Sequence, residues 1–113
     1  MKIAIIGSRG LTVDNLEKYL PENVTEIISG GAKGIDACAA KYAKASGIRL
    51  TEYLPQYDQF GKQAPLMRNM RIVQSAELII AFWDGKSTGT EFVIDTCKAL
   101  DKPIKIIHLS TCK

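Results

Sequence analysis

Short apolar runs alternate along this chain with amphipathic stretches of helical spacing. Runs rich in β-branched residues predict five strands: Lys2–Ile6, Val24–Ser29, Ile48–Leu54, Leu78–Trp83 and Pro103–Leu109. The stretches between them predict helices over Val13–Leu20, Lys33–Ser46, Pro65–Ser75 and Thr90–Leu100. Two remaining segments, Gln56–Gln63 and Asp84–Gly89, are polar or rich in glycine and are predicted to be loops.

The regular alternation of strand and helix predicts a parallel sheet that helices cover on both faces. Because crossover connections are right-handed, few topologies are compatible with this order. We expect a single α/β, Rossmann-like three-layer domain over residues 1–113, with five parallel strands in the order 3-2-1-4-5. Ligands of such sheets bind beyond the carboxyl ends of the strands, here at the switch point between strands 1 and 4.

Three predicted strands end in a loop rich in glycine and hydroxyl residues. These loops are Gly7–Gly10, Ser29–Gly34 and Asp84–Thr90, and the expected topology brings them to one edge of the sheet. Glycine allows a close approach of the main chain, and the first N–H groups of a helix attract anions. A single loop of this kind is almost as often only a tight turn, but three together favour a phosphate site.

Polar side chains in and near these loops suit the same chemistry. Ser8, Ser87 and Thr90 offer hydroxyl groups, while Arg9 and Arg68 offer charge-assisted hydrogen bonds. None of the loops has the dinucleotide pattern GxGxxG. The Gly-Lys-Ser at 85–87 resembles the end of the P-loop pattern GxxxxGK[ST], but an isoleucine stands at 80, where that pattern has its first glycine. An ATPase or GTPase motor is therefore not expected.

Three other residues leave alternatives open. Asp36 complements the dipole of its helix, or it bonds a ribose hydroxyl or organises the loop. Trp83 suits core packing better than base stacking. His108, the only histidine, lies in the last strand and is expected away from the loops, in a structural or surface role. No group of residues has metal-ligand spacing, and no Ser-His-Asp arrangement can be assembled near the pocket.

Composition narrows the class of protein further. The chain has 113 residues, of which 46% are hydrophobic and 24% charged, and its formal net charge is +3. This mild positive charge is compatible with a phosphate ligand. The chain lacks the dense stripe of basic residues that is typical of a nucleic-acid binder. No apolar run is long enough for a signal peptide or membrane span, so a cytoplasmic location is expected. Cys38, Cys97 and Cys112 indicate neither a disulfide framework nor a zinc site.

Several spaced motifs resemble those of a known family. They are Ser-Gly-Gly-Ala-Lys-Gly-Ile-Asp at 29–36, Gly-Lys-Gln-Ala at 61–64, Arg-Asn at 68–69 and Ala-Phe-Trp-Asp-Gly-Lys-Ser-Thr-Gly-Thr at 81–90. In this order they are similar to the YspA-like, cpYpsA-related branch of the SLOG superfamily, over nearly the whole chain. The resemblance implies a Rossmann-like fold that binds nucleotides or nucleotide-derived molecules such as ADP-ribose. The superfamily also contains the Lonely Guy phosphoribohydrolases and the DNA-processing protein DprA.

The loops and the resemblance together give one set of candidate ligand-binding residues: Gly7, Ser8, Arg9, Gly30, Gly31, Gly34, Asp36, Arg68, Asn69, Gly85, Ser87, Gly89 and Thr90. The match to the Lonely Guy loop, PGGxGTxxE, is poorer. The glutamate of that loop acts in cleaving the N-glycosidic bond, but Val93 stands three positions after Thr90 here. Glu91 follows Thr90 directly and should face elsewhere on the helix.

Three functions follow as hypotheses. The first is a sensor or carrier that binds a nucleotide-derived ligand and requires no metal or other cofactor. The second is a hydrolase of an N-glycosidic or phosphate bond, for which the candidate catalytic residues are Asp36, Arg68, Asp84 and Glu91. The third is binding of single-stranded DNA, as in DprA, through Lys62, Arg68, Arg71 and Lys86. Nucleic acid is not the expected partner, and a homodimer is left open.

Overall fold

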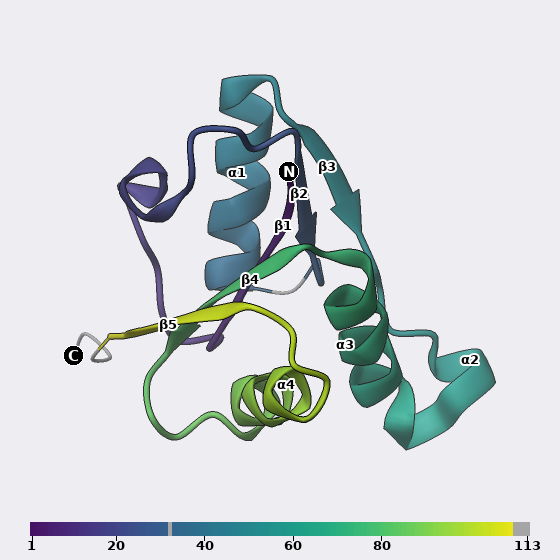
Figure 1. Cartoon of the computed structure of the whole chain (residues 1–113). Helices are drawn as coiled ribbons and strands as arrows, with labels where there is room; N and C mark the ends of the chain where they lie inside the picture. Colours follow the sequence, from purple (N-terminus) through teal and green to yellow (C-terminus); the bar gives the residue numbers. More distant parts are fainter. Residues whose placement is uncertain (32, 110–113) are drawn as a thin grey trace.

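The computed structural model describes residues 1–31 and 33–109, and its centre is a sheet of five parallel strands (Figure 1). The strands lie in the order β3-β2-β1-β4-β5. Their bounds are Lys2–Gly7 (β1), Glu26–Ser29 (β2), Arg49–Glu52 (β3), Leu78–Trp83 (β4) and Ile104–His108 (β5). The predicted α/β class and the predicted strand order are both confirmed.

Helices and short helical turns connect these strands. The α-helices are Ile35–Ser46 (α1), Tyr57–Phe60 (α2), Ala64–Ser75 (α3) and Thr88–Ala99 (α4), and the 3-10 helices are Leu16–Tyr19 (η1) and Gly61–Gln63 (η2). Among the described residues, no helix has the length and apolar character needed to cross a membrane. Ala32 of the second glycine-rich loop and Cys112 lie outside the described residues.

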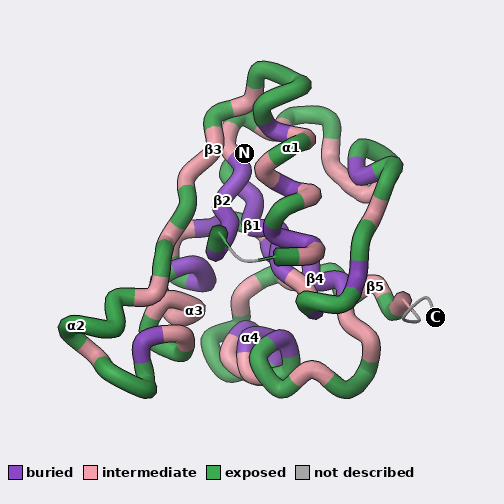
Figure 2. The backbone as a smooth tube through the Cα atoms, turned by 180° about the vertical axis from the view of Figure 1, so that it is seen from behind, coloured by how far each residue is buried: buried purple, intermediate pink, exposed green. Residues whose placement is uncertain are grey.

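Alternate residues of the central strands point to two separate apolar layers. On one face, Ile3, Ile5 and Phe82 pack with residues of α1 and η1. On the other face, Ile6 and Ala81 pack with residues of α3 and α4. Figure 2 shows that β1 is buried almost throughout, as expected for a central strand covered on both sides. The two layers hold the carboxyl ends of the strands in fixed relative positions.

The prediction of a helix over residues 13–20 is wrong, because only the 3-10 turn η1 forms there. Leu16 is the one buried residue of η1 and anchors it to the core. Leu20 is extended, with φ −97° and ψ 147°. Pro21 follows it, and a residue before proline is disfavoured in the helical region. The helical segment therefore ends before Leu20, and the residues that remain are too few for an α-helix.

Two segments predicted as loops contain helix. Residues 57–63 form α2 and η2, and Gly61, the first residue of η2, has a φ of +57°. A single turn of helix leaves no periodic signal in the sequence, so α2 could not be recognised. α4 begins at Thr88, two residues before the predicted start, because Ser87 is already its extended N-cap.

Replacing Phe82 by alanine is expected to lower the free energy of unfolding by about 3–5 kcal/mol. Phe82 is fully buried in β4 and packs edge-on against the Tyr19 ring, so its loss leaves a cavity. Denaturant titration would measure the change. Leu100→Ala, at a residue 52% exposed, is the matched control and should change stability by about 0.5 kcal/mol or less. Equal effects of the two substitutions would contradict the assigned core.

Candidate functional site

A cavity of about 480 Å³ lies beyond the carboxyl ends of β1, β2 and β4. Most of the predicted ligand-binding residues line it: Gly7, Ser8, Arg9, Gly30, Asp36, Arg68, Asn69, Ser87, Gly89 and Thr90. The three glycine-containing loops therefore do meet at one edge of the sheet, as the strand order requires. The α3 and α4 helices supply the rest of the wall.

Close packing at the end of β1 forms the floor of the cavity. A Cβ atom on Gly7 would lie 2.5 Å from Cγ1 of Ile35 and 2.6 Å from the Phe82 carbonyl oxygen. Only glycine fits between α1 and β4 at this point. Ser8 follows and is buried, and its N–H donates to the same Phe82 oxygen at 3.1 Å. The Ser8 hydroxyl is therefore fixed in the crevice between β1 and β4.

Asp84 organises the loop between β4 and α4. Its Oδ1 accepts the N–H groups of Lys86 and Ser87, both at 2.8 Å, and its own N–H donates to Ser8 Oγ at 3.4 Å. The bonds from the Lys86 and Ser87 N–H groups hold the pKa of the Asp84 carboxyl below its ordinary value, with a smaller contribution from Ser8. The Trp83 indole N–H adds a bond to the Ser87 carbonyl at 3.1 Å. The loop thus has a defined shape before any ligand binds.

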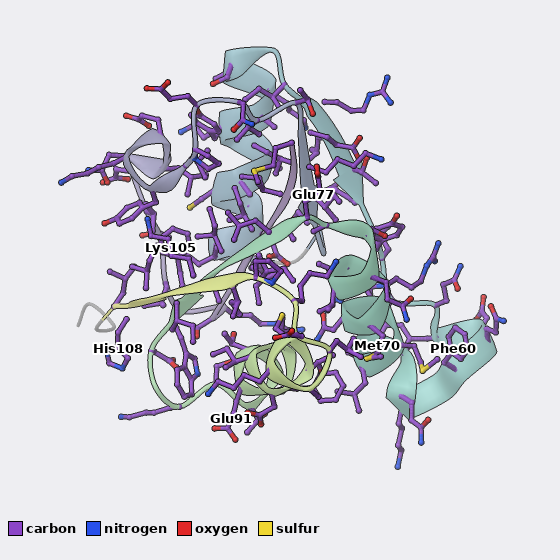
Figure 3. The ribbon with its side chains drawn as sticks, viewed as in Figure 1. Phe60, Met70, Glu77, Glu91, Lys105 and His108 are labelled. Atoms are coloured by element: carbon purple, nitrogen blue, oxygen red, sulfur yellow. The ribbon has the colours of Figure 1, made fainter. Side chains whose placement is uncertain are left out.

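His108 lies against this loop, so the expectation that it lies away from the loops is wrong. In the parallel register of the sheet, His108 of β5 is the partner of Trp83 in β4. A Cβ atom on Gly85 would lie 2.8 Å from His108 Nε2, and the Trp83 and His108 rings meet edge-on. Figure 3 shows the exposed His108 side chain near the end of β5. Its role as a surface packing residue stays a prediction.

The N-terminus of α4 opens into the cavity. Thr88, Gly89 and Thr90 form its first turn and all line the wall. The first N–H groups of an α-helix have no partner within the helix and carry the positive end of its dipole. Ser87 makes no side-chain capping bond, and its hydroxyl instead bonds the Thr90 hydroxyl at 3.4 Å. This arrangement suits an anion with several oxygen atoms.

Arg68 of α3 reaches across the cavity to the loop after β2. Its Nη1 donates to the Gly30 carbonyl oxygen at 2.7 Å, and its Nε donates to Asn69 Oδ1 at 2.8 Å. A Cβ atom on Gly30 would lie 2.6 Å from Nη1 and 3.0 Å from Asp36 Oδ2. Because Gly30 has no side chain, the Arg68 guanidinium and the Asp36 carboxylate can lie side by side in the wall.

Burial lowers the pKa of Arg68, while the nearby Asp36 carboxylate and the Tyr57 phenol both raise it. Arg9 acts in the lowering direction because it places a second positive charge near the first. Arg9 is exposed at the cavity mouth, whereas Arg68 is half-buried. An anion in the cavity would therefore meet one half-buried cation and one exposed cation.

Four candidates lie outside the cavity wall. Gly31, Gly34 and Gly85 have φ values of +70°, +71° and +81°, so they serve the turns around the cavity. A Cβ atom on Gly34 would strike the Arg9 carbonyl oxygen. Glu91 is exposed and points outward from α4 (Figure 3).

Sequence reasoning missed part of the wall. Pro65 and Leu66 in the first turn of α3, and Ile72 and Val93 deeper in the core, give the cavity an apolar side. The sequence could have indicated Leu66 and Ile72. They flank Arg68 and Asn69 on a helix whose start the sequence predicts. Thr88 was missed because α4 was predicted to begin two residues later.

No protein-family model, curated protein or solved structure matches this chain. The cavity and its side chains are therefore the basis for assigning a function. Among residues 1–31 and 33–109, no group of three or more histidine, cysteine, aspartate or glutamate residues could hold a metal ion.

Asp84→Asn is expected to lower the stability of the folded chain at pH 7. The folded-state pKa of Asp84 lies below its unfolded value, so the stabilisation is present above the unfolded pKa. It is lost as the pH falls from about 4 through the folded-state pKa. Denaturant titrations of both proteins between pH 7 and pH 2.5 would follow the difference.

Asp95→Asn, on the exposed side of α4, is the control for loss of one carboxylate. It should leave stability nearly unchanged across the same pH range. A constant difference between Asp84→Asn and the unchanged protein from pH 7 to pH 2.5 would refute the role given to the Asp84 carboxylate.

Proposed function

We propose that this protein binds a nucleotide or nucleotide-derived phosphate ligand in the cavity, as a sensor or carrier in the cytoplasm. One observation carries the proposal: strand-end loops from β1, β2 and β4 share a single cavity with the N-terminus of α4. This is the position where parallel α/β sheets bind their ligands. In this proposal the chain belongs to the YspA-like branch of the SLOG superfamily, which its motifs resemble.

The phosphate would lie at the N-terminus of α4. N–H groups of Thr88, Gly89 and Thr90 face that position, the Ser8 and Ser87 hydroxyls are close by, and Arg9 supplies charge from the mouth. These donors are fixed by the Asp84 loop, so binding needs little reorganisation. The phosphate would therefore have both the helix dipole and the Arg9 guanidinium to neutralise its charge.

The sugar would lie toward the Arg68 side of the cavity. Asp36 and Asn69 line that side, and their carboxylate and amide oxygens are suitable acceptors for ribose hydroxyl groups. The apolar Pro65 and Leu66 adjoin them on α3. A nucleoside phosphate, with a charged end, a hydroxyl-rich centre and a flat apolar end, fits this order of groups.

Hydrolysis of an N-glycosidic bond is the second candidate, and one observation favours it. The Asp36 carboxylate and the Arg68 guanidinium lie together around Gly30, where a carboxylate would face the proposed ribose. Chromatography after incubation with AMP, ADP-ribose and NAD would separate the two functions, because only the hydrolase releases free base. Binding without product supports the sensor or carrier. A salt-dependent gel shift with single-stranded DNA would instead favour the DprA-like function.

Arg9→Ala is expected to weaken ligand binding about 10-fold or more, because a charge-assisted contact to phosphate is lost. Calorimetry with AMP and ADP-ribose would measure the dissociation constants. Trp83 is the only tryptophan and bonds the Ser87 carbonyl, so its fluorescence is a second readout.

Arg49→Ala removes another exposed arginine, from the edge strand β3, and should leave affinity unchanged. The same loss in both variants would indicate a general charge effect. Absence of binding of every nucleotide tested to the unchanged protein would refute the proposed function.

A further inference from the structure

Asn69 of α3 is held in one orientation by the residue that precedes it. The Arg68 Nε–H group donates to Asn69 Oδ1 at 2.8 Å. Adjacent residues of a helix do not face one another, so sequence adjacency alone does not produce this bond. The Nε–H group can only donate, and the amide therefore turns its oxygen, not its nitrogen, toward Arg68. The Nδ2 group lies at the other corner of the amide, away from the Nε–H group.

The far end of the Arg68 side chain is also bonded to the protein. Its Nη1 donates to the carbonyl oxygen of Gly30, just beyond the end of β2, at 2.7 Å. While both bonds hold, neither Nε–H nor that Nη1–H is available for a bidentate contact to a ligand. Arg68 is thus fixed between two elements, and the atom it fixes in turn is the Asn69 amide oxygen.

The Nδ2 group of Asn69 is available to a ligand in the main cavity, which Asn69 lines. It has no acceptor among residues 1–31 and 33–109, and no fully buried polar side-chain atom of those residues lacks a partner. The Nδ2 group is therefore open to the cavity and offers two N–H donors. The hydrogen bond from the Arg68 cation polarises the amide and strengthens these donors.

The wall beside Asn69 restricts which ligand group can use these donors. A Cβ atom on Gly30 would lie 2.6 Å from Arg68 Nη1 and 3.0 Å from Asp36 Oδ2, so a carboxylate shares this side of the cavity. An ionised phosphate oxygen only accepts hydrogen bonds and would be repelled by the carboxylate. A hydroxyl group both accepts and donates, so it can bond the Nδ2 group and the carboxylate together.

Building on the proposed function, we propose that Asn69 selects ribose over deoxyribose by donating an Nδ2 hydrogen bond to a ribose hydroxyl group. That hydroxyl donates its own hydrogen to the Asp36 carboxylate. Arg68 is the positioning residue, because its Nε–H group keeps the amide donors turned toward the sugar. A sugar without the hydroxyl leaves both polar groups without their ligand partner, which is the basis of discrimination.

Calorimetry with AMP and its two deoxy analogues, each lacking one ribose hydroxyl, tests the role of Asn69. The unchanged protein is expected to bind AMP about 10-fold more tightly than one of the analogues. Asn69→Ala should reduce this preference to about threefold, since only the bond to Asp36 remains, and should leave affinity for that analogue within about twofold. Asn69→Asp can still accept the Arg68 Nε–H bond but lacks the donors, so it should reduce the preference equally.

The control and a second variant distinguish Asn69 from its surroundings. Gln74→Ala removes an exposed amide from the other end of α3 and should leave the preference at about 10-fold. Arg68→Lys keeps the charge, but one ammonium group cannot occupy both the Nε and Nη1 positions. It should reduce the preference to about threefold, and combining it with Asn69→Ala should reduce it no further, because both changes remove the same bond.

The outcomes separate this inference from the proposed function. Equal binding of AMP and both analogues by the unchanged protein overturns the selection of ribose and leaves nucleotide binding in place. An equal loss of affinity for AMP and both analogues in Asn69→Ala also overturns it. The same uniform loss in Arg68→Lys overturns the positioning role, because Arg68 would then contact the ligand itself. If the unchanged protein binds no nucleotide, the proposed function fails and this inference with it.

Discussion

At Gly7 the end of β1 touches the first residue of α1 and the main chain of β4, and the cavity depends on this contact. The side chain of Ile35 and the Phe82 carbonyl oxygen occupy the space that any Cβ atom would need. Because they meet there, α1 begins directly over the end of β1, and Ser8 turns into the crevice beside β4. A larger residue would separate the two halves of the sheet at the switch point, where the donors must converge.

Asp84 extends this arrangement from the sheet to the last helix. Its carboxylate closes a turn with the N–H groups of Lys86 and Ser87, and Ser8 ties that turn to β1. The turn decides where α4 starts and therefore where its unpaired N–H groups point. Two loops far apart in the sequence thus form one rigid rim. Such a rim reduces the ordering that a bound anion would otherwise require.

The sequence was informative wherever general rules of chain packing decide the outcome. Buried β-branched strands and right-handed crossovers predict the sheet order, and that order alone brings Gly7, Gly30 and Ser87 together. The sequence was uninformative where the structure depends on the register between two strands or on a single turn of helix. His108 meets Gly85 only because it pairs with Trp83 across β4 and β5, and no local pattern reveals that pairing. The helix α2 spans one turn, which is too short for a 3.6-residue period to appear.

The positions and contacts of the carboxylates suit the proposed binding function. A general base works best with a pKa near the working pH, but the bonds to Asp84 lower its pKa and commit the carboxylate to holding the loop. Glu91 faces away from the cavity on the exposed side of α4. Asp36 is the remaining acidic residue in the wall, and its carboxylate lies beside the Arg68 guanidinium. Carboxylate oxygens accept hydrogen bonds from hydroxyl groups, so Asp36 suits the ribose contact of the proposed function.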